Sequence, residues 1–424
     1  MKVLLIGSGG REHALARSIV ASPKLTELFV APGNAGTQEY NIDLDTADNA
    51  AVVAWCTDNH IDLVVVGPEA PLVNGIGDAL AQAKIACFGP SQAAAELEGS
   101  KAFTRRFAER CGIPSPASQA FTNSAEAIAW FRLQSFDVVV KADGLAAGKG
   151  VIIPETDDET IAAIESMLDQ NLLGESSSTI VLEECMAGEE LSLFGVSDGS
   201  TVIALATAQD HKRVGNGDTG PNTGGMGAFS PVPGVDASRQ AELSSIFLEP
   251  AIAGMAEAGT PYVGVLFAGI MLTPAGPKLV EYNCRFGDPE AEVVLPMLAC
   301  DALEMFAAAA TGSLDTFESA MRSGVAATVV VCAEGYPESP TKDIAVPDLG
   351  CTDDVCVYYA GTRRSDDGLL LSSGGRVLAV TGIGDDLDAA LTNSYRLVDQ
   401  ITGNGLFARN DIGWRHSQIR SGKS

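Results

Sequence analysis

The stretch LVEYNCRFGDPE brings an acid, an amide and a guanidinium close together. Successive side chains of an extended strand point to opposite faces, so Glu281, Asn283 and Arg285 share one face while Val280, Tyr282 and Cys284 share the other. Carboxylate and amide oxygens suit a hard cation such as Mg²⁺, and an arginine can hold a phosphoryl group through two hydrogen bonds. The pattern predicts the metal and phosphoryl side of a nucleotide site. A surface strand with a local Glu and Arg pair is the alternative interpretation.

A second stretch, VVVKADGLAAGKGVII, ends an apolar strand and enters a glycine loop that carries a second lysine. Glycines let backbone N–H groups approach an anion closely, and the lysines add positive charge, which is what a triphosphate requires. The spacing differs from a P-loop because a glycine follows the second lysine where Ser or Thr would bind magnesium. A glycine-rich hairpin with solvated lysines is the alternative. The residues expected at the phosphates are Lys141, Gly144, Gly148, Lys149 and Gly150.

A third stretch, TIVLEECMAGEELSLF, runs from a strand into two acids, a glycine turn and two more acids. A ribose needs a carboxylate that accepts its hydroxyl protons, and a base needs backbone donors and acceptors in an apolar slot. Each of these acids alone is more often a solvated surface residue. Beside the lysine loop, Glu183, Glu184 and Glu190 indicate a nucleotide site.

The first hundred residues repeat a strand, turn and helix pattern, as in KVLLIGSGG, ELFVAPGNAG and IDLVVVGPEAP. Continuous apolar strands that alternate with helices predict a doubly wound parallel sheet, whose ligands gather at residues 7–11, 32–37 and 67–71. The loop GSGGREH lacks the dinucleotide fingerprint because Glu12 replaces its last glycine. A helix N-terminus beside this loop still suits a phosphate.

The rest of the chain changes pattern twice. A basic helix, SKAFTRRFAERCGIPSP, leads into a small α+β unit and a longer section of strands and loops, and the last hundred residues are mostly β. The expected fold is therefore a multidomain mixture of α/β and α+β. The expected domains are an N-terminal α/β domain at 1–100, a central domain at 101–322 that contains the small unit at about 121–190, and a small β-rich domain at 323–424.

The composition limits the partners. A net charge of −28 over 424 residues argues against nucleic acid or membrane surfaces, which such a polyanion would repel. Nine scattered cysteines without a CxxC pair signal neither a disulfide framework nor a zinc site, and they fit a reducing cytoplasm. No apolar run approaches the length of a membrane span.

Four long motifs favour one enzyme family. GSGGREHALA, KADGLAAGKG, AQDHKRVGNGDTGPNTGGMGAFSP and EYNCRFGDPE resemble, in this order, the phosphoribosylamine–glycine ligase family of the ATP-grasp superfamily, and the resemblance extends to the terminal RNDIGWR. It implies ligation of glycine to 5-phosphoribosylamine in de novo purine biosynthesis, with ATP and Mg²⁺ or Mn²⁺, through a glycyl phosphate. It also implies small-molecule substrates, a cytoplasmic location and a monomer or homodimer.

The resemblance makes residues 1–100 a substrate-binding domain and residues 101–322 an ATP-grasp domain, whose mobile lid is the unit at about 121–190. It also assigns roles to individual residues.

It places ATP at Lys101, Lys141, Gly144, Gly148, Lys149, Gly150, Glu183, Glu184, Met186 and Glu190. Adenine is expected against the backbone of 184–186, with Glu183 near its amino group and Glu190 on the ribose. The resemblance implies metal ligands at Glu281 and Asn283, and catalytic roles for Asp210, Lys212, Arg285 and Asp288.

On the phosphoribosylamine side it implies Gly9, Gly10, Arg11, Asn34, Gly36, Thr37, Pro68 and Glu69. On the loop that closes over glycine it implies His211, Thr223, Gly224, Gly225 and Met226. For His211, a loop histidine satisfied by backbone groups is the alternative.

Two rival functions stay open. One is another ATP-grasp carboxylate–amine ligase of purine metabolism, which DHKRVGNGDTGPNTGGMG disfavours. The other is a regulatory nucleotide-binding protein with a degenerate site, which the intact Lys141, Glu281, Asn283 and Arg285 disfavour. The strand VGVLFAGIML, before the Glu and Asn strand, carries no acid. Water or an acid from elsewhere must therefore complete the metal shell.

Overall fold

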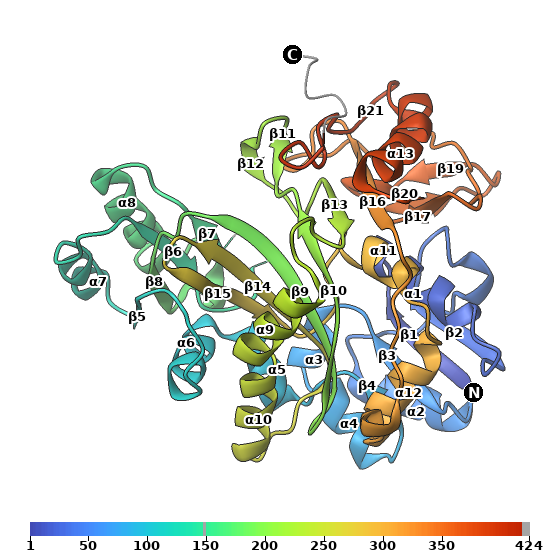
Figure 1. Cartoon of the computed structure of the whole chain (residues 1–424), viewed down its shortest axis with the longest axis horizontal. Coiled ribbons are helices and arrows are strands. Elements are labelled where there is room, and N and C mark those ends of the chain that lie inside the picture. Colours follow the sequence, from blue (N-terminus) through green and yellow to red (C-terminus); the bar gives the residue numbers. More distant parts are fainter. Residues whose placement is uncertain (147–149, 418–424) are drawn as a thin grey trace.

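The structure of the chain is a computed structural model that describes residues 1–146 and 150–417 (Figure 1). Within those residues, no helix combines the length and the apolar character needed to cross a membrane.

The N-terminal part is a four-stranded parallel sheet in the order β2-β1-β3-β4. Its strands are β1 (Lys2–Gly7), β2 (Glu27–Pro32), β3 (Leu63–Val66) and β4 (Ala86–Phe88). Its helices are α1 (Gly10–Val20), α2 (Asn49–Asp58), α3 (Glu69–Val73), α4 (Ile76–Gln82) and α5 (Gln92–Gly99), with a short 3₁₀ turn, η1 (Gln38–Tyr40). The β3 strand is buried along its whole length, as expected for a parallel strand covered on both faces. The predicted parallel α/β sheet is confirmed.

A small antiparallel unit follows helix α6 (Lys101–Arg110) and projects from the rest of the molecule (Figure 1). Its sheet has the order β5-β8-β6-β7 and one face carries two helices. The strands are β5 (Ser118–Phe121), β6 (Val138–Ala142), β7 (Val151–Ile152) and β8 (Ile180–Glu184), and the helical elements are α7 (Ser124–Phe131), α8 (Asp157–Leu168) and η2 (Gly174–Ser177). Val140, Ile164 and Leu182 belong to a core that this unit has to itself.

A nine-stranded antiparallel sheet forms the body of the molecule, in the order β15-β14-β9-β10-β13-β16-β20-β17 with β21 beside β16. Its first strands are β9 (Glu189–Asp198), β10 (Val202–Asp210), β13 (Gly227–Ser230), β14 (Val263–Thr273) and β15 (Gly276–Asn283). Its later strands are β16 (Val325–Ala333), β17 (Val355–Tyr359), β20 (Arg376–Gly384) and β21 (Leu406–Phe407). Because β13 pairs with β16, the sheet runs without a break from the central part into the last hundred residues.

Further helices and two hairpins cover this sheet. The helical elements are α9 (Ala237–Phe247), α10 (Glu249–Glu257), α11 (Ala291–Val294), η3 (Leu295–Met297), α12 (Ala302–Thr311), η4 (Leu314–Thr316) and α13 (Leu387–Ile401). The hairpins pair β11 (Arg213–Gly215) with β12 (Thr219–Asn222) and β18 (Thr362–Arg364) with β19 (Leu370–Ser372). Helix α1 packs against α11 and β17, so the N-terminal sheet and the C-terminal strands meet along one helix (Figure 1).

Strand β15 carries Glu281 and Asn283 and is followed directly by Cys284 and Arg285. Tyr282 and Cys284 are each 1% exposed, and the Tyr282 hydroxyl donates to the carbonyl of Phe247, so this face packs as predicted. The register between β14 and β15 shifts after the Gly269–Glu281 pair, so Ile270 faces Leu279 and Val280 is left over as a bulge. The alternation therefore holds from Glu281 onward and is broken before it.

Candidate functional site

Lys141 ends strand β6 inside a buried ion-pair cluster. Its Nζ lies 2.7 Å from Glu183 Oε2 on the neighbouring strand β8. Arg105 of α6 donates to both oxygens of Glu183, at 2.7 Å from Nε and 2.8 Å from Nη2. Burial alone would raise the pKa of Glu183, but Lys141 and Arg105 lower it to about 2. The carboxylate is engaged by two cations, which differs from the predicted contact between Glu183 and the adenine amino group.

The predicted phosphate loop, which begins at Gly144 and ends at Gly150, is held by backbone hydrogen bonds at its start and at its end. Lys101 N donates to the Asp143 carbonyl at 3.2 Å, and Gly144 N donates to the Ser176 carbonyl at 3.1 Å. At the far end, the Gly150 carbonyl accepts from Ala142 N at 2.7 Å. Gly148 and Lys149, which the sequence predicts at the phosphates, lie outside the described residues.

The predicted adenine hinge follows β8. Glu184 N donates to the Ala117 carbonyl at 2.8 Å, and Cys185 N donates to the Asp137 carbonyl at 2.7 Å. The Glu184 carboxylate lies 2.7 Å from Lys278 Nζ on β15. The hinge therefore ties the small antiparallel unit to the body of the molecule, and Met186 comes next in the chain.

Lys212 lies among carboxylates that the sequence assigned to different tasks. Its ammonium pairs with Glu190 on β9. Burial would lower the pKa of Lys212, but the charges of Glu190, Asp210 and Glu281 outweigh burial and raise it. Burial also raises the pKa of Asp210, at the end of β10, to about 8. The structure thus brings the predicted ribose, catalytic and metal residues into one acidic cluster around a single lysine.

Glu281 and Asn283 occupy alternate positions of β15 and offer oxygen atoms as metal ligands. Asn283 Nδ2 lies 3.5 Å from Glu281 Oε1. Burial would raise the pKa of Glu281, but four cations lower it, so the carboxylate is ionised. These cations are Lys212, Lys141, Lys101 and Arg285. Among the described residues, no group of three His, Cys, Asp or Glu side chains is arranged to hold a metal. The pair fits a Mg²⁺ ion whose other ligands are phosphate oxygens and water.

Arg285 directs its guanidinium toward the N-terminal sheet. Its Nη2 donates to Glu98 Oε1 at 2.8 Å, and its Nε donates to Glu69 Oε2 at 3.2 Å. Glu98 also accepts from Cys284 N at 2.7 Å. The sequence did not single out Glu98, because a lone acid near the end of a helix carries no signal of its own.

The glycine-rich loop before α1 and the first residues of this helix contact residues 286–288. Arg11 N donates to Asp288 Oδ2 at 3.3 Å, and Arg11 Nη1 donates to the Phe286 carbonyl at 2.9 Å. A Cβ added to Gly10 would lie 2.3 Å from Glu292 Oε1, so a larger residue would displace the Glu292 carboxyl group. Glycine at this position lets the loop and the buried Glu292 side chain touch.

Two loop residues predicted to face phosphoribosylamine are instead used to hold the loops. The buried Asn34 donates from Nδ2 to the carbonyls of Tyr359 at 2.7 Å and Ser8 at 2.9 Å, and its Oδ1 accepts from Gly36 N at 2.7 Å. Thr37 is buried, and its Oγ1 accepts from Asn34 N at 3.0 Å. Pro68 and Glu69 lie at the start of α3, where Glu69 meets Arg285.

The predicted glycine loop, residues 210–226, presents backbone to the site and buries two of its side chains. The ring of His211 contacts the Gly227 carbonyl through Nδ1 at 3.3 Å, and its Nε2 accepts from Gly413 N at 3.0 Å. Burial, aided by the charge of Arg409, lowers the pKa of His211 to about 4. Met226 is fully buried in the main core. The side chains of His211 and Met226 are therefore buried in the protein and do not face a substrate.

Thr223, Gly224 and Gly225 form the turn of this loop, in which Gly224 is exposed and Gly225 is buried. Thr223 N donates to the Lys212 carbonyl at 2.7 Å, and Thr223 Oγ1 accepts from Gly225 N at 3.0 Å. Gly225 has φ +115, and a Cβ there would lie 2.3 Å from Pro289 Cδ. This turn is therefore pressed directly onto the DPE motif of residues 288–290.

Arg376 of β20 is a site residue that the sequence did not reveal. Its Nη1 donates to the carbonyls of Gly224 and Asp288, each at 2.6 Å, and lies 3.0 Å from Asp288 Oδ1. The hydroxyl of Tyr336 accepts from Gly224 N at 3.0 Å. Arg376 begins β20 and Tyr336 lies in the turn after β16, and both stretches show no motif. Only the folded structure places them on the predicted glycine loop.

Glu292 is a second residue without a sequence signal. Its side chain is fully buried, and neither carboxylate oxygen has a hydrogen-bond partner within the described part of the chain. Burial, with the charge of Asp288, raises the pKa of Glu292 well above its usual range. This carboxyl group lies under Gly10 and interacts with the charges of Asp288 and Arg376.

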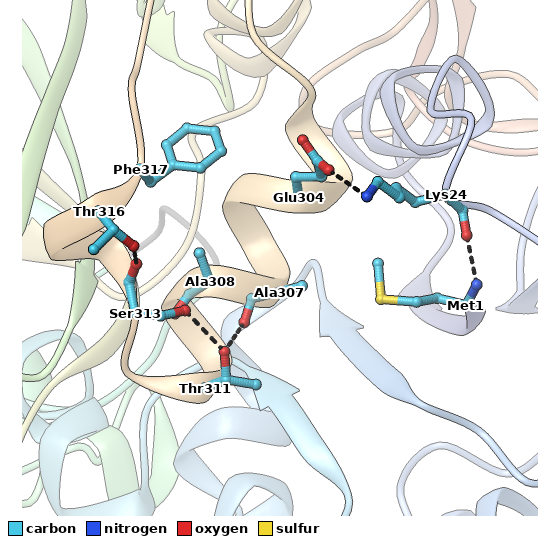
Figure 2. Close-up of a pocket in the computed structure, with 9 residues that line it drawn as sticks. All are labelled: Met1, Lys24, Glu304, Ala307, Ala308, Thr311, Ser313, Thr316 and Phe317. Carbon is cyan, nitrogen blue, oxygen red and sulfur yellow. Dashed lines mark hydrogen bonds and ion pairs between the residues drawn. The ribbon is translucent and has the colours of Figure 1, made fainter.

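A surface hollow of about 560 Å³ lies apart from these residues (Figure 2). It is bounded by the chain start and α12, and Lys24 Nζ lies 3.0 Å from Glu304 Oε1 across its rim. None of the predicted site residues lines this hollow. The candidate site is therefore defined by the charged side chains and loops described above, and not by this hollow.

Family models match nearly the whole chain. The descriptions are the N domain of phosphoribosylglycinamide synthetase at residues 1–98, its ATP-grasp (A) domain at 99–291 and its C domain at 326–415. The phosphoribosylamine–glycine ligase of Agrobacterium fabrum is 48% identical over 418 residues, which cover 98% of each chain. The chain belongs to the phosphoribosylamine–glycine ligase family. It is an ATP-dependent ligase that joins glycine to phosphoribosylamine in purine biosynthesis.

Other relatives agree with this family membership. The phosphoribosylamine–glycine ligase of Vibrio cholerae is 46% identical, with 98% of each chain covered. The crystal structure of the Thermotoga maritima phosphoribosylamine–glycine ligase has a TM-score of 0.81 at 31% identity, covering 96% of this chain and 99% of that one. The biotin carboxylase domain of a Hydrogenobacter thermophilus 2-oxoglutarate carboxylase has a TM-score of 0.77 at 15% identity, covering 96% and 91%. This last likeness concerns the fold alone.

Proposed function

We propose that the ligase works through a glycyl phosphate, with the chemistry centred on Glu281. One observation carries the proposal: four cationic side chains from separate parts of the chain, namely Lys101, Lys141, Lys212 and Arg285, converge on this ionised carboxylate. A triphosphate that loses its terminal phosphoryl group needs this density of positive charge. The glycine carboxylate attacks the γ-phosphorus of ATP and releases ADP, which gives glycyl phosphate. The amino group of 5-phosphoribosylamine then displaces phosphate from the acyl carbon and loses a proton.

The nucleotide lies, in this proposal, between the small antiparallel unit and β15. Lys101 and Lys141 bind the phosphates, together with the loop that begins at Gly144 and ends at Gly150. The N–H groups of Glu184 and Cys185 are already donated, so adenine uses the backbone of Met186. Glu183 is proposed to hold Lys141 at the phosphates through their ion pair, and not to contact the adenine amino group.

Glu281 and Asn283 are the proposed ligands of a divalent cation, Mg²⁺ or Mn²⁺. When bound, the cation would neutralise phosphate charge. Glu190 is proposed at the ribose, and its ion pair with Lys212 must then be exchanged for a hydroxyl contact. Lys212 is released by that exchange and can reach the developing charge on the transferred phosphoryl group.

Glycine is proposed to bind under the turn at Thr223, Gly224 and Gly225, next to Asp210. The nearby Lys212 suits its carboxylate, because the N–H groups of Thr223, Gly224 and Gly225 are already donated to Lys212, Tyr336 and Thr223. His211 acts as a positioning residue because both of its ring nitrogens are engaged by backbone groups. An acyl phosphate hydrolyses readily, so the lid at about 121–190 is proposed to close and exclude water.

Phosphoribosylamine is proposed to bind on the N-terminal side, at Gly9, Gly10 and Arg11, with Gly36, Pro68 and Glu69 around it. The N-terminus of α1 suits its phosphate once the Glu12 carboxylate, which accepts from Ser8 N and Gly9 N, gives way to it. Arg11, which now pairs with Glu12, would then be free to contact the phosphate. Asp288 accepts from Arg11 N and pairs with Arg376, so it lies between this loop and the glycine turn. That position suits a group that orients the attacking amine. Arg285 is held at the same edge by Glu69 and Glu98, and it is kept as the proposed phosphoryl contact.

The test is an assay of ADP release with ATP, Mg²⁺, phosphoribosylamine and glycine, each omitted in turn. We expect ADP release to require glycine. Formate or bicarbonate in place of glycine distinguishes the other ATP-grasp ligases of purine metabolism, and ADP release with either of them but not with glycine would contradict the proposal. We further propose a cytoplasmic monomer or homodimer, which analytical ultracentrifugation and cell fractionation would check.

A further inference from the structure

The C-terminal strands carry a pair of cysteines that the ligase reaction does not use. Cys351 and Cys356 flank a turn in which Thr352 N donates to the Val355 carbonyl at 2.8 Å. Cys356 lies in β17, the edge strand that follows β20 in the nine-stranded sheet. Both thiols belong to partly exposed residues. A small reagent in solution can therefore reach them.

The turn places the two cysteines opposite each other. In an antiparallel hairpin, the residues just outside a hydrogen-bonded pair face one another with Cα atoms about 4.5 Å apart. Disulfides join residues whose Cα atoms lie about 4.4–6.8 Å apart. The thiols of Cys351 and Cys356 are already hydrogen-bonded to each other. The backbone is thus arranged to accept a disulfide without moving the strand.

The surroundings make one of the two sulfurs the nucleophile. Cys351 Sγ accepts from Val357 N at 3.4 Å as well as from the thiol of Cys356. These donors stabilise a thiolate and lower the pKa of Cys351 to about 6, with the Cys356 hydrogen bond as the main cause. By contrast, burial raises the pKa of the Cys56 and Cys332 thiols to about 12. Thiolates are the reactive form of cysteine.

We propose that Cys351 and Cys356 form a reversible dithiol–disulfide site that reacts with small disulfides. The thiolate of Cys351 attacks one sulfur of the reagent, forms a mixed disulfide and releases one thiolate. Cys356 then loses its proton and attacks Cys351 Sγ, which forms the Cys351–Cys356 bond and releases the second thiol. The protein loses two electrons, and the reagent gains them as two thiols.

The probe is bis(2-hydroxyethyl) disulfide, which is neutral and avoids repulsion by Asp353 and Asp354 in the turn. The full chain is oxidised, quenched with acid, alkylated and digested with trypsin. Both cysteines lie on the single tryptic peptide 343–363, which has no internal Lys or Arg. We expect this peptide to lose both alkylation sites and two hydrogen masses, while Cys300 stays alkylated. Dithiothreitol should restore both sites.

The unfolded chain is the matched control, since the two cysteines are near each other in sequence in any state. In urea, the bridge should need at least about tenfold more oxidant at equilibrium, because the native turn has already closed the loop. The Cys356→Ser variant should stop at a mixed disulfide on Cys351, and both Cys351→Ser and Cys356→Ser should keep ligase activity. Free alkylation of both cysteines in the oxidised native chain, or equal oxidant demand in both states, would overturn the site.

Discussion

The nucleotide side and the phosphoribosylamine side of the site are built differently. On the nucleotide side, Lys141, Glu183 and Arg105 pair within one buried cluster, next to a small sheet that has its own core. On the other side, Asn34 and Arg376 make hydrogen bonds to the carbonyls of Tyr359 and Asp288, which lie 325 and 88 residues away in sequence. A site for a common nucleotide can be carried by one compact unit, whereas the substrate side requires the whole chain to fold around it.

Glu281 lies where the two sides meet, so its replacement should have the largest effect. We expect Glu281→Gln to lower kcat/KM at least about 1000-fold, because it removes the charge that faces four cations and the proposed metal. The measurement is glycine-dependent ADP release, with the thermal unfolding midpoint as a check on the fold. The exposed pair partner Glu27→Gln is the matched control. Normal turnover in Glu281→Gln would remove this residue from the chemistry.

Arg376 tests the side that depends on long-range contacts. We expect Arg376→Met to lower kcat/KM for phosphoribosylamine and glycine about 100-fold, because the glycine turn and Asp288 lose their shared donor. Arg363→Met removes an exposed arginine of the same part of the chain and should change little. Steady-state kinetics with each substrate varied in turn gives the answer. An effect confined to the KM for ATP would break the division into two sides.

His211 predicts a smaller, pH-dependent effect on stability. Its pKa is about 4 in the folded chain against 6.5 for an unperturbed histidine, so the unfolded chain binds more protons between these values. Lowering the pH from about 7 to about 5.5 should therefore cost the folded state about 1 kcal/mol through this residue. Urea unfolding at both pH values should show a smaller pH dependence in His211→Gln. An unchanged dependence would mean that the buried ring does not titrate as its surroundings indicate.

The sequence predicted most of what is local. The parallel sheet followed from apolar strands such as Leu63–Val66, and the packed face of β15 followed from strand alternation at Tyr282 and Cys284. The motifs also predicted one site for Asp210, Lys212 and Glu281, and the structure brings these three residues together. These predictions succeeded because periodicity and motif spacing encode local structure directly.

What the sequence missed depends on long-range contacts. Arg376, Tyr336 and Glu98 lie in stretches without motifs, and only chain folding brings them to the site. His211 and Asn34 were expected to face substrate, but the backbone groups that satisfy them come from residues 413 and 359. The joining of β13 to β16 was equally invisible, because strand pairing across a predicted boundary leaves no local pattern.

The most direct test of the two-sided account compares ATP binding in two variants by calorimetry, without glycine or phosphoribosylamine. Lys141→Ala should weaken ATP binding about 30-fold, because it removes a buried charge from the proposed phosphate site. Glu69→Gln, on the N-terminal side, should change ATP affinity less than about twofold, since the amide oxygen can still accept from Arg285. Equal weakening in both variants would contradict the account and would mean that the two sides bind the nucleotide together.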